Sequence, residues 1–237
     1  MTSGARGENT EKMLPKKYIA LDLGFRNMGY AALTIWQPAH DVPHARIELN
    51  NTRWLAGQPM PKTLDVAQMF LDYFVPRLWP HIGRNTTSLI LEKPYLLARS
   101  QSSTIAAPLI SLYNCVYVYF KTMDPTLPIV GYPPSIKHSL YGFDTKNKDA
   151  ITDWAAKIVA GVDDSIIAPA TKHYFSTTPK KDDIADALFY LLHQLRLDHG
   201  LSVGAFKDPK AVRDWLHYLF LLPTEAPATL APLPERM

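Results

Sequence analysis

The sequence predicts an α/β domain with a central mixed five-stranded sheet flanked by helices. Two observations support this fold class. Five short apolar segments with the composition of strands lie within the first 134 residues, and segments of helical periodicity separate and follow them. A chain of 237 residues with 47% hydrophobic composition can bury one substantial core, so we expect one large domain.

The predicted domain opens with three strands, at residues 18–24, 28–36 and 45–55. Only residues 24–28 connect the first two strands, which leaves room for a turn and nothing longer. We therefore expect the chain to begin with an antiparallel meander.

Helices and strands alternate after the meander. Residues 63–79 carry apolar side chains at helical spacing, and residues 87–94 follow as a short buried strand. Residues 102–122 are expected to form a packed helix, and residues 127–134 form a strand closed by prolines. Helical signals dominate the rest of the chain. This order, βββαβαβα with a helix-rich end, is that of the ribonuclease H-like fold.

Composition limits the partners. Lys and Arg outnumber Asp and Glu by only 25 to 22, so an acidic partner must meet a local basic surface. The single cysteine, Cys115, excludes an intramolecular disulfide and a cysteine-built zinc site, and we expect a buried reduced thiol. The most apolar stretch, residues 105–120, is shorter than the roughly 20 residues of a membrane span, so no membrane partner is expected.

The two ends of the chain differ from the domain between them. Residues 1–16 are polar and contain two glutamates, so we expect a flexible arm that is neither a secretory signal nor a clear transit peptide. Residues 223–237 are rich in proline and alanine and are expected to be disordered. The domain is then expected to span residues 17–222.

Acidic residues occur at three separated places that the predicted fold can bring together. Asp22 lies in an apolar strand, Glu92 closes another strand, and Asp182, Asp183 and Asp186 open a helix. Each position alone has a structural explanation as a turn residue or as a helix N-terminal acid. An acid inside an apolar strand, however, costs several kcal/mol unless it is paired or ligates a metal. The conjunction therefore predicts a metal site.

The residue types indicate which metal. Hard divalent cations such as Mg²⁺ prefer carboxylate oxygens and water, and acids from two strands and one helix could hold two of them. Two ions about 4 Å apart would activate a water and stabilise the leaving oxygen of a phosphodiester.

Three motifs resemble those of a known family. The segments "IALDLGFRNMGYAAL", "LILEKPYLLARSQSS" and "KKDDIADALFYLL", in that order, are similar to those of the RuvC-like Holliday-junction resolvases, most of all the fungal mitochondrial kind. The resemblance covers roughly residues 17 to 200. It implies a mitochondrial homodimeric endonuclease with a ribonuclease H-like fold that uses Mg²⁺ or Mn²⁺, two per active site, to nick two strands of a four-way DNA junction symmetrically. No nucleotide cofactor is implied.

The resemblance also implies roles for the acids. Asp22 is expected to bridge the metals, Glu92 to be the second ligand, and Asp186 to complete the site with Asp183 or Asp182. The helical wheel leaves those last two tied, because each shares a face with Asp186. Similarity to the bacterial D-x-x-D-A pattern favours Asp183, and Asp182 would then be a helix N-terminal acid or an outer partner.

The residues expected to contact DNA are Arg26, Asn27, Tyr95, Arg99, Lys137, Lys146, Lys148, Lys180 and Lys181. Arg26 and Asn27 lie in the turn after Asp22, where Asn27 could equally stabilise the turn. Tyr95 stands three residues after Glu92, where bacterial members have an aromatic, and a packed tyrosine is the alternative to a wedge in the junction. For Lys137, Lys146 and Lys148, the alternative is a solvated basic loop.

Other classes of protein were weighed. A junction-binding protein that does not cut, and a ribonuclease H-like nuclease with another nucleic-acid substrate, both stay open. An actin-like sugar kinase needs a glycine-rich second lobe, whereas this chain has 11 glycines and no Gly-Gly pair. The G-x-S-x-G motif of a Ser-His-Asp hydrolase does not occur in this sequence.

Fungal resolvases commonly carry a helical extension before the first strand, where this chain has about sixteen polar residues. Trp154 and the aromatic segment 105–120 are candidates for a dimer interface.

Overall fold

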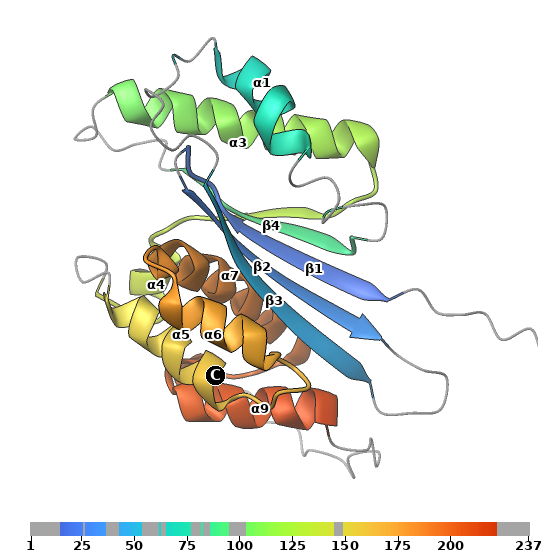
Figure 1. The fold of residues 1–237 in the computed structure, drawn as a ribbon, viewed down its shortest axis with the longest axis vertical. Helices are drawn as coiled ribbons and strands as arrows, with labels where there is room; N and C mark the ends of the chain where they lie inside the picture. The colour runs from blue at the N-terminus through green and yellow to red at the C-terminus, as the bar shows by residue number, and fades with distance from the viewer. Residues whose placement is uncertain are drawn as a thin grey trace, which may run out of the picture.

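A computed structural model of the chain describes residues 15–25, 27–36, 43–53, 62, 65–76, 82, 86–94, 103–144 and 149–221, with backbone alone at 52, 53 and 103–106. These residues form a sheet with helices on both faces (Figure 1). The expected C-terminal tail lies outside the described residues. So does the expected N-terminal arm, except for residues 15 and 16, and Lys16 already belongs to the first strand.

The sheet has five strands in the order β3-β2-β1-β4-β5. Their bounds are Lys16–Asp22 (β1), Asn27–Trp36 (β2), His44–Arg53 (β3), Ser88–Glu92 (β4) and Ile129–Tyr132 (β5). The first three strands form an antiparallel meander, and β4 and β5 continue the sheet in parallel with β1. The predicted mixed five-stranded sheet is therefore confirmed.

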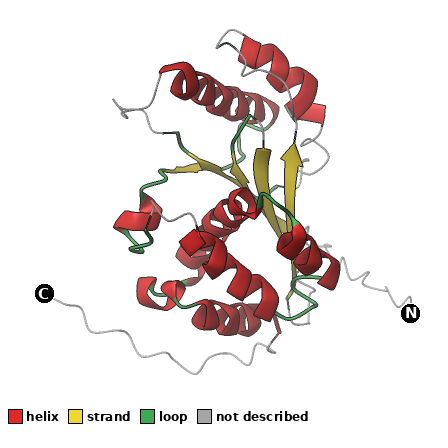
Figure 2. Cartoon of the chain, turned by 60° about the vertical axis from the view of Figure 1, so that its left-hand side comes forward, coloured by secondary structure: helices red, strands yellow, loops and turns green. Residues whose placement is uncertain are grey.

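Helices cover the two faces unequally. On one face lie α1 (Val66–Met69), which continues into a π-helical turn, η2 (Phe70–Phe74), and the long helix α3 (Ser103–Met123). On the other side lie α4 (Ile136–Ser139), α5 (Asp149–Gly161), α6 (Pro169–Thr177), α7 (Lys181–His199), α8 (Val203–Lys207) and α9 (Pro209–Leu221). Figure 2 shows the sheet between these two layers. The sequence had predicted a helix-rich end without resolving α6, α8 and α9.

The alternation of side chains along β1 assigns its residues to the two faces. Ile19 and Leu21 pack under α1, η2 and α3, whereas Tyr18 and Ala20 pack towards α5 and α7. Asp22 is the next residue in the second series. The strand therefore places its last carboxylate on the α7 face.

Helix α7 lies across that face and fills its core. Its buried residues include Ile184, Leu188, Leu191 and Leu195, spaced at three and four as an amphipathic helix requires. The helix ends at Gly200, whose φ of 79° is the left-handed conformation that favours glycine after a helix.

Two expectations about individual residues need correction. Trp154 is buried inside the chain's own core, and its indole N–H donates a hydrogen bond to the Phe206 carbonyl at 3.1 Å, so it is not available to a dimer interface. Cys115 is a free thiol as expected, but it is only partly buried, because α3 turns this residue towards the rim of its core. In the part of the chain that the structure describes, no helix combines the length and apolarity that a membrane crossing needs.

Candidate active site

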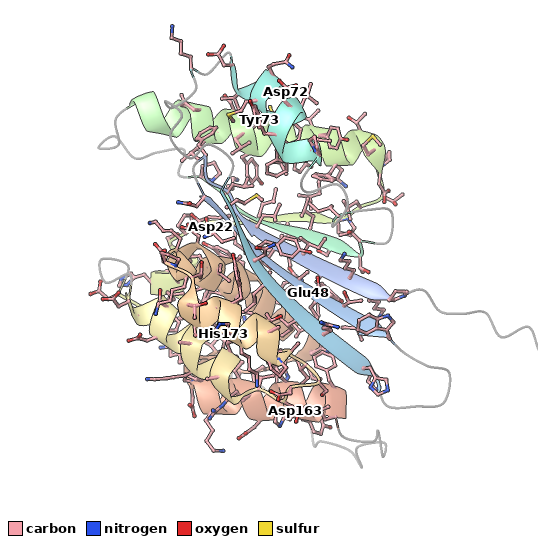
Figure 3. All side chains as sticks on the ribbon, in the orientation of Figure 1. Asp22, Glu48, Asp72, Tyr73, Asp163 and His173 are labelled. Atoms are coloured by element: carbon pink, nitrogen blue, oxygen red, sulfur yellow. The ribbon has the colours of Figure 1, made fainter. Side chains whose placement is uncertain are left out.

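Four strands contribute one row of residues at the end of the sheet. Asp22 on β1 is paired with Gly29 on β2, and Glu92 on β4 is paired with Tyr132 on β5. The parallel register of β1 with β4 runs up to the position just before Asp22 and Glu92, so the two acids are neighbours across the sheet. Figure 3 shows Asp22 at this end of the sheet, where β1 meets the start of α7.

Helix α7 adds a second row above the first. Asp183, Asp186 and Tyr190 are spaced at three and four, so they share one side of the helix. The helix can approach the sheet here because Gly29 has no side chain: a Cβ at Gly29 would overlap the Asp183 carbonyl oxygen. This glycine therefore sets the distance between the carboxylates of the sheet and those of the helix.

A lysine from the segment after β5 lies between the two rows. The Lys137 ammonium is 2.6 Å from Asp186 Oδ1 and 3.2 Å from Glu92 Oε2, and its side chain is only 9% exposed. It also lies 4.8 Å from the ring centroid of Tyr190. Lys137 thus joins an acid of the sheet to an acid of the helix instead of pointing into solvent.

Tyr190 fixes the orientation of Glu92 through a hydrogen bond. Its buried hydroxyl donates a hydrogen bond to Glu92 Oε2 at 2.7 Å. Burial, with the nearby charge of Glu92, raises the pKa of Tyr190, so this hydroxyl stays protonated and remains a donor. The Tyr190 ring is nearly parallel to that of Tyr132, at 6.2 Å between centroids, and the pair forms the floor of the site.

Burial, with repulsion between the carboxylates, raises the pKa values of Asp22 and Asp186 more than Lys137 lowers them. Loss of water, followed by the charges of Glu92 and Asp186, raises the pKa of Asp22 well above its ordinary value, although Lys137 opposes the shift. Burial likewise raises the pKa of Asp186 to about 6, again against the influence of Lys137. Burial by itself would lower the pKa of Lys137, but Glu92 and Asp186 outweigh it and the net shift is upwards. The cluster therefore has an excess of negative charge that a further cation would neutralise.

The donor set fits a hard divalent cation. Asp22, Glu92, Asp183 and Asp186 offer carboxylate oxygens alone, which suits Mg²⁺ or Mn²⁺ and disfavours softer metals. In the arrangement seen among the described residues, no three acidic, histidine or cysteine side chains are grouped closely enough to hold one ion together. One oxygen of Glu92 and one of Asp186 face the Lys137 ammonium instead, at 3.2 and 2.6 Å.

The two aspartates that the helical wheel left tied have different charged neighbours. Asp183 is one of the charges that raise the pKa of both Asp22 and Asp186. Asp182 Oδ2 lies 3.8 Å from the Lys180 ammonium. Asp183 stays the predicted partner of Asp186.

The basic pair before α7 is exposed beside the cluster. Lys180 and Lys181 are both exposed, and the Lys180 carbonyl accepts a hydrogen bond from Asn51 Nδ2 at 2.8 Å. The Asn51 backbone N–H donates in turn to the hydroxyl of Tyr174, at 3.1 Å. These contacts tie β3 and α6 to the start of α7 and so position the lysines.

Six residues that the sequence predicts to contact DNA remain, and the structure describes one of them, Asn27. Asn27 begins β2 opposite Arg53, and a Cβ at Gly24 would overlap its carbonyl oxygen, which shows how tight the preceding turn is. The other five predicted contacts lie outside the described residues: Arg26, Tyr95, Arg99, Lys146 and Lys148.

Sequence reasoning missed two residues that shape the site, Gly29 and Tyr190. A glycine inside an apolar strand is a recognised sign of close backbone approach, so Gly29 had a usable signal. Tyr190 stands four residues after Asp186, the spacing of helix neighbours, but nothing in the sequence shows that it reaches Glu92.

The strand order and the two helical layers are those of a ribonuclease H-like fold. No family model and no curated protein matches the chain. Among solved structures, RuvC of Thermus thermophilus is similar at 14% identity with a TM-score of 0.43, over 78% of this chain and 96% of that one. The yeast mitochondrial Holliday junction resolvase Ydc2 is similar at 12% identity with a TM-score of 0.49, over 85% of this chain and 84% of that one. T. thermophilus RuvC in complex with a Holliday junction substrate gives the same values as RuvC alone.

Proposed function

We propose that this protein is a structure-selective DNA endonuclease that resolves four-way junctions by metal-dependent hydrolysis of two opposed strands. The observation that carries the proposal is the convergence of Asp22, Glu92, Asp183 and Asp186 at one end of the sheet. These acids belong to the three motifs that resemble the RuvC-like resolvases. Local packing alone gives no reason to gather repelling carboxylates.

The four acids would hold two Mg²⁺ or Mn²⁺ ions. Bound there, the ions would supply an activated water and charge stabilisation for the leaving oxygen of a phosphodiester. The chain's own residues prepare the site. Tyr190 holds Glu92 in place through its hydrogen bond, and Gly29 lets α7 bring its two aspartates to the strand acids.

Phosphate contacts are proposed at the start of α7. Lys180 and Lys181 are exposed there, at the positive end of the helix macrodipole, and both features favour a phosphate close to the acids. Binding should depend steeply on salt, because each neutralised phosphate of duplex DNA adds about 0.9 to the slope of log affinity against log salt concentration.

Paired nicks imply two sites in one assembly, and we propose a homodimer. The layer of α3 and η2 supports this, because it leaves several large hydrophobic side chains exposed. They are Leu71, Tyr73, Tyr117, Val118 and Met123. Figure 3 shows Tyr73 in the layer of α1 and α3. The family resemblance also favours a mitochondrial location, which imaging of the tagged protein in cells would test.

The deciding experiment compares a labelled four-way junction with a linear duplex of the same arm sequence, with Mg²⁺ and with chelator. We expect symmetrical paired nicks in the junction with Mg²⁺ only, and little cutting of the duplex. Tight junction binding without any nicks would favour the non-cleaving alternative. Equal cutting of junction, duplex and RNA–DNA hybrid would favour a nuclease with another substrate.

A further inference from the structure

The Lys137 ammonium lies between two of the carboxylates that we propose as metal ligands. Its Nζ lies within 3.2 Å of one oxygen from Glu92 and one from Asp186, two residues that we propose as metal ligands. Its aliphatic stem is covered, and its charge lies over the Tyr190 ring. A lysine at this point neutralises part of a cluster that would otherwise be strongly repulsive.

An ammonium and a divalent ion compete for these oxygens. Two like charges a few ångströms apart in a partly buried site repel strongly. The conflict can be resolved by movement of the side chain alone. The backbone of Lys137 is fixed, because its N–H donates to the Pro134 carbonyl at 3.3 Å and its carbonyl accepts from the Phe143 N–H at 3.0 Å. The four-carbon stem beyond it is flexible.

We propose that Lys137 is a tethered substitute for the metal. Its ammonium neutralises Glu92 and Asp186 while no ion is bound, and it leaves that position when a divalent ion enters. Lys137 therefore sets the metal affinity of the site, since every binding event must first displace it. This inference rests on the proposed metal site.

The Tyr190 hydroxyl holds Glu92 in place while the metal ion replaces Lys137. It donates to the same oxygen, Glu92 Oε2, at 2.7 Å, which is shorter than the 3.2 Å contact from Lys137. The tyrosine is fully buried and cannot follow the lysine out. Glu92 therefore keeps its orientation through the exchange, and the displaced ammonium becomes free to meet a DNA phosphate, as the sequence predicted for Lys137.

The test measures Mn²⁺ binding to the DNA-free protein by isothermal titration calorimetry. Lys137→Met keeps the stem over Tyr190 but removes the competing charge, so its dissociation constant for Mn²⁺ should fall about tenfold relative to wild type. Lys137→Arg keeps the charge and should gain no affinity. The matched control is Lys172→Met on α6. It removes the ion pair between Lys172 and Asp164 (2.7 Å) and should leave the Mn²⁺ affinity unchanged.

A second measurement uses the wild-type protein, so it does not depend on how the variants fold. With ¹³C-labelled lysine, the ε-carbon signal of Lys137 should move towards the position of exposed lysines as Mg²⁺ saturates the protein. Weaker or equal Mn²⁺ binding by Lys137→Met, or an unmoved Lys137 signal with Mg²⁺ bound, would overturn the inference and leave the metal site standing. Absence of Mn²⁺ binding in wild type and all variants would overturn the metal site itself.

Discussion

The two faces of the sheet are made from the same strands but differ where those strands end. Under α1, η2 and α3, β1 and β4 finish with Leu21 and Leu91, which are completely buried among hydrocarbon. Under α7 the same strands finish one residue later with Asp22 and Glu92. The pleat of a strand turns successive side chains to opposite faces, so one position separates core from site.

The ends of the strands also affect the stability of the fold in opposite directions on the two faces. Each buried leucine stabilises the fold by about 1.5–3 kcal/mol, whereas the acids destabilise it through desolvation and mutual repulsion. A cluster that costs stability without metal needs a firm support. The helix α7 provides it, because below its acidic first turns its residues pack into the larger of the two cores.

Substitutions at Leu21 and Asp22 test the difference between the two faces most directly. Asp22→Asn should lower the cleavage rate by about a hundred- to a thousandfold, because loss of a metal ligand removes several kcal/mol of stabilisation of the transition state. Its thermal stability in chelator should stay equal to wild type or rise, because a repelling charge is removed. Leu21→Ala should instead lower the free energy of unfolding by about 2–5 kcal/mol through the cavity it leaves.

Junction cleavage and thermal unfolding of both variants test this pair of effects. The folded fraction of Leu21→Ala should still bind Mn²⁺ with wild-type affinity. Near-normal cleavage by Asp22→Asn would show that the acid has no role in metal binding.

Substitutions of the two aspartates at the start of α7 test which of them binds metal beside Asp186. Asp183→Asn should slow cleavage by about a hundredfold, because Asp183 is close enough to Asp22 and Asp186 to influence both. Asp182→Asn removes a partner of Lys180 and should have only a mild effect. Cleavage rates across a range of Mg²⁺ concentrations rank the two, and a larger loss for Asp182→Asn would show that the four-residue spacing is the one in use.

Tyr190→Phe tests the support of Glu92 without touching any acid. Loss of the hydroxyl should weaken Mn²⁺ binding by about tenfold, because an outer partner that orients a metal ligand typically contributes this much. Tyr132→Phe is the matched control, since it removes a hydroxyl that donates to Gln194 at 2.6 Å on the neighbouring ring. Equal titration curves for Tyr190→Phe and wild type would contradict the role of the hydrogen bond.

The smallest expected effect is on the pH dependence of stability without metal. The pKa of Asp186 is raised from 3.8 to about 6, so between these values the folded protein binds more protons than the unfolded chain. Stability relative to Asp186→Asn should therefore fall as pH rises from about 4 to 6, by the linkage of proton binding to folding. Asp214 has a lowered pKa through its hydrogen bond to Lys210, so the difference for Asp214→Asn should not fall as pH rises over this range.

Thermal unfolding in chelator across this pH range gives both differences. A relative stability that rises with pH for Asp186 would mean that Lys137 stabilises its charge more than burial destabilises it.

Much of the fold could be predicted from sequence because it depends on local periodicity. The strands around Asp22 and Glu92 and the helix after Lys181 follow from alternation and helical spacing. The convergence of the acids followed from the order of those elements.

The rest depends on contacts between distant segments. Lys137 was predicted to meet phosphate from its place in a basic loop, yet it folds back onto residues 45 and 49 positions away. Trp154 was considered for an interface because it is large and aromatic, but α8 covers it within the same chain. No local pattern contains such information, since it arises only when the helices pack.

The most direct test of the central claim is anomalous scattering from crystals of the DNA-free protein soaked in Mn²⁺. We predict peaks between the carboxylates of Asp22, Glu92, Asp183 and Asp186, with the Lys137 ammonium displaced from Glu92 and Asp186. Peaks confined to other surfaces, with Lys137 still in contact with both acids at saturating Mn²⁺, would contradict the account.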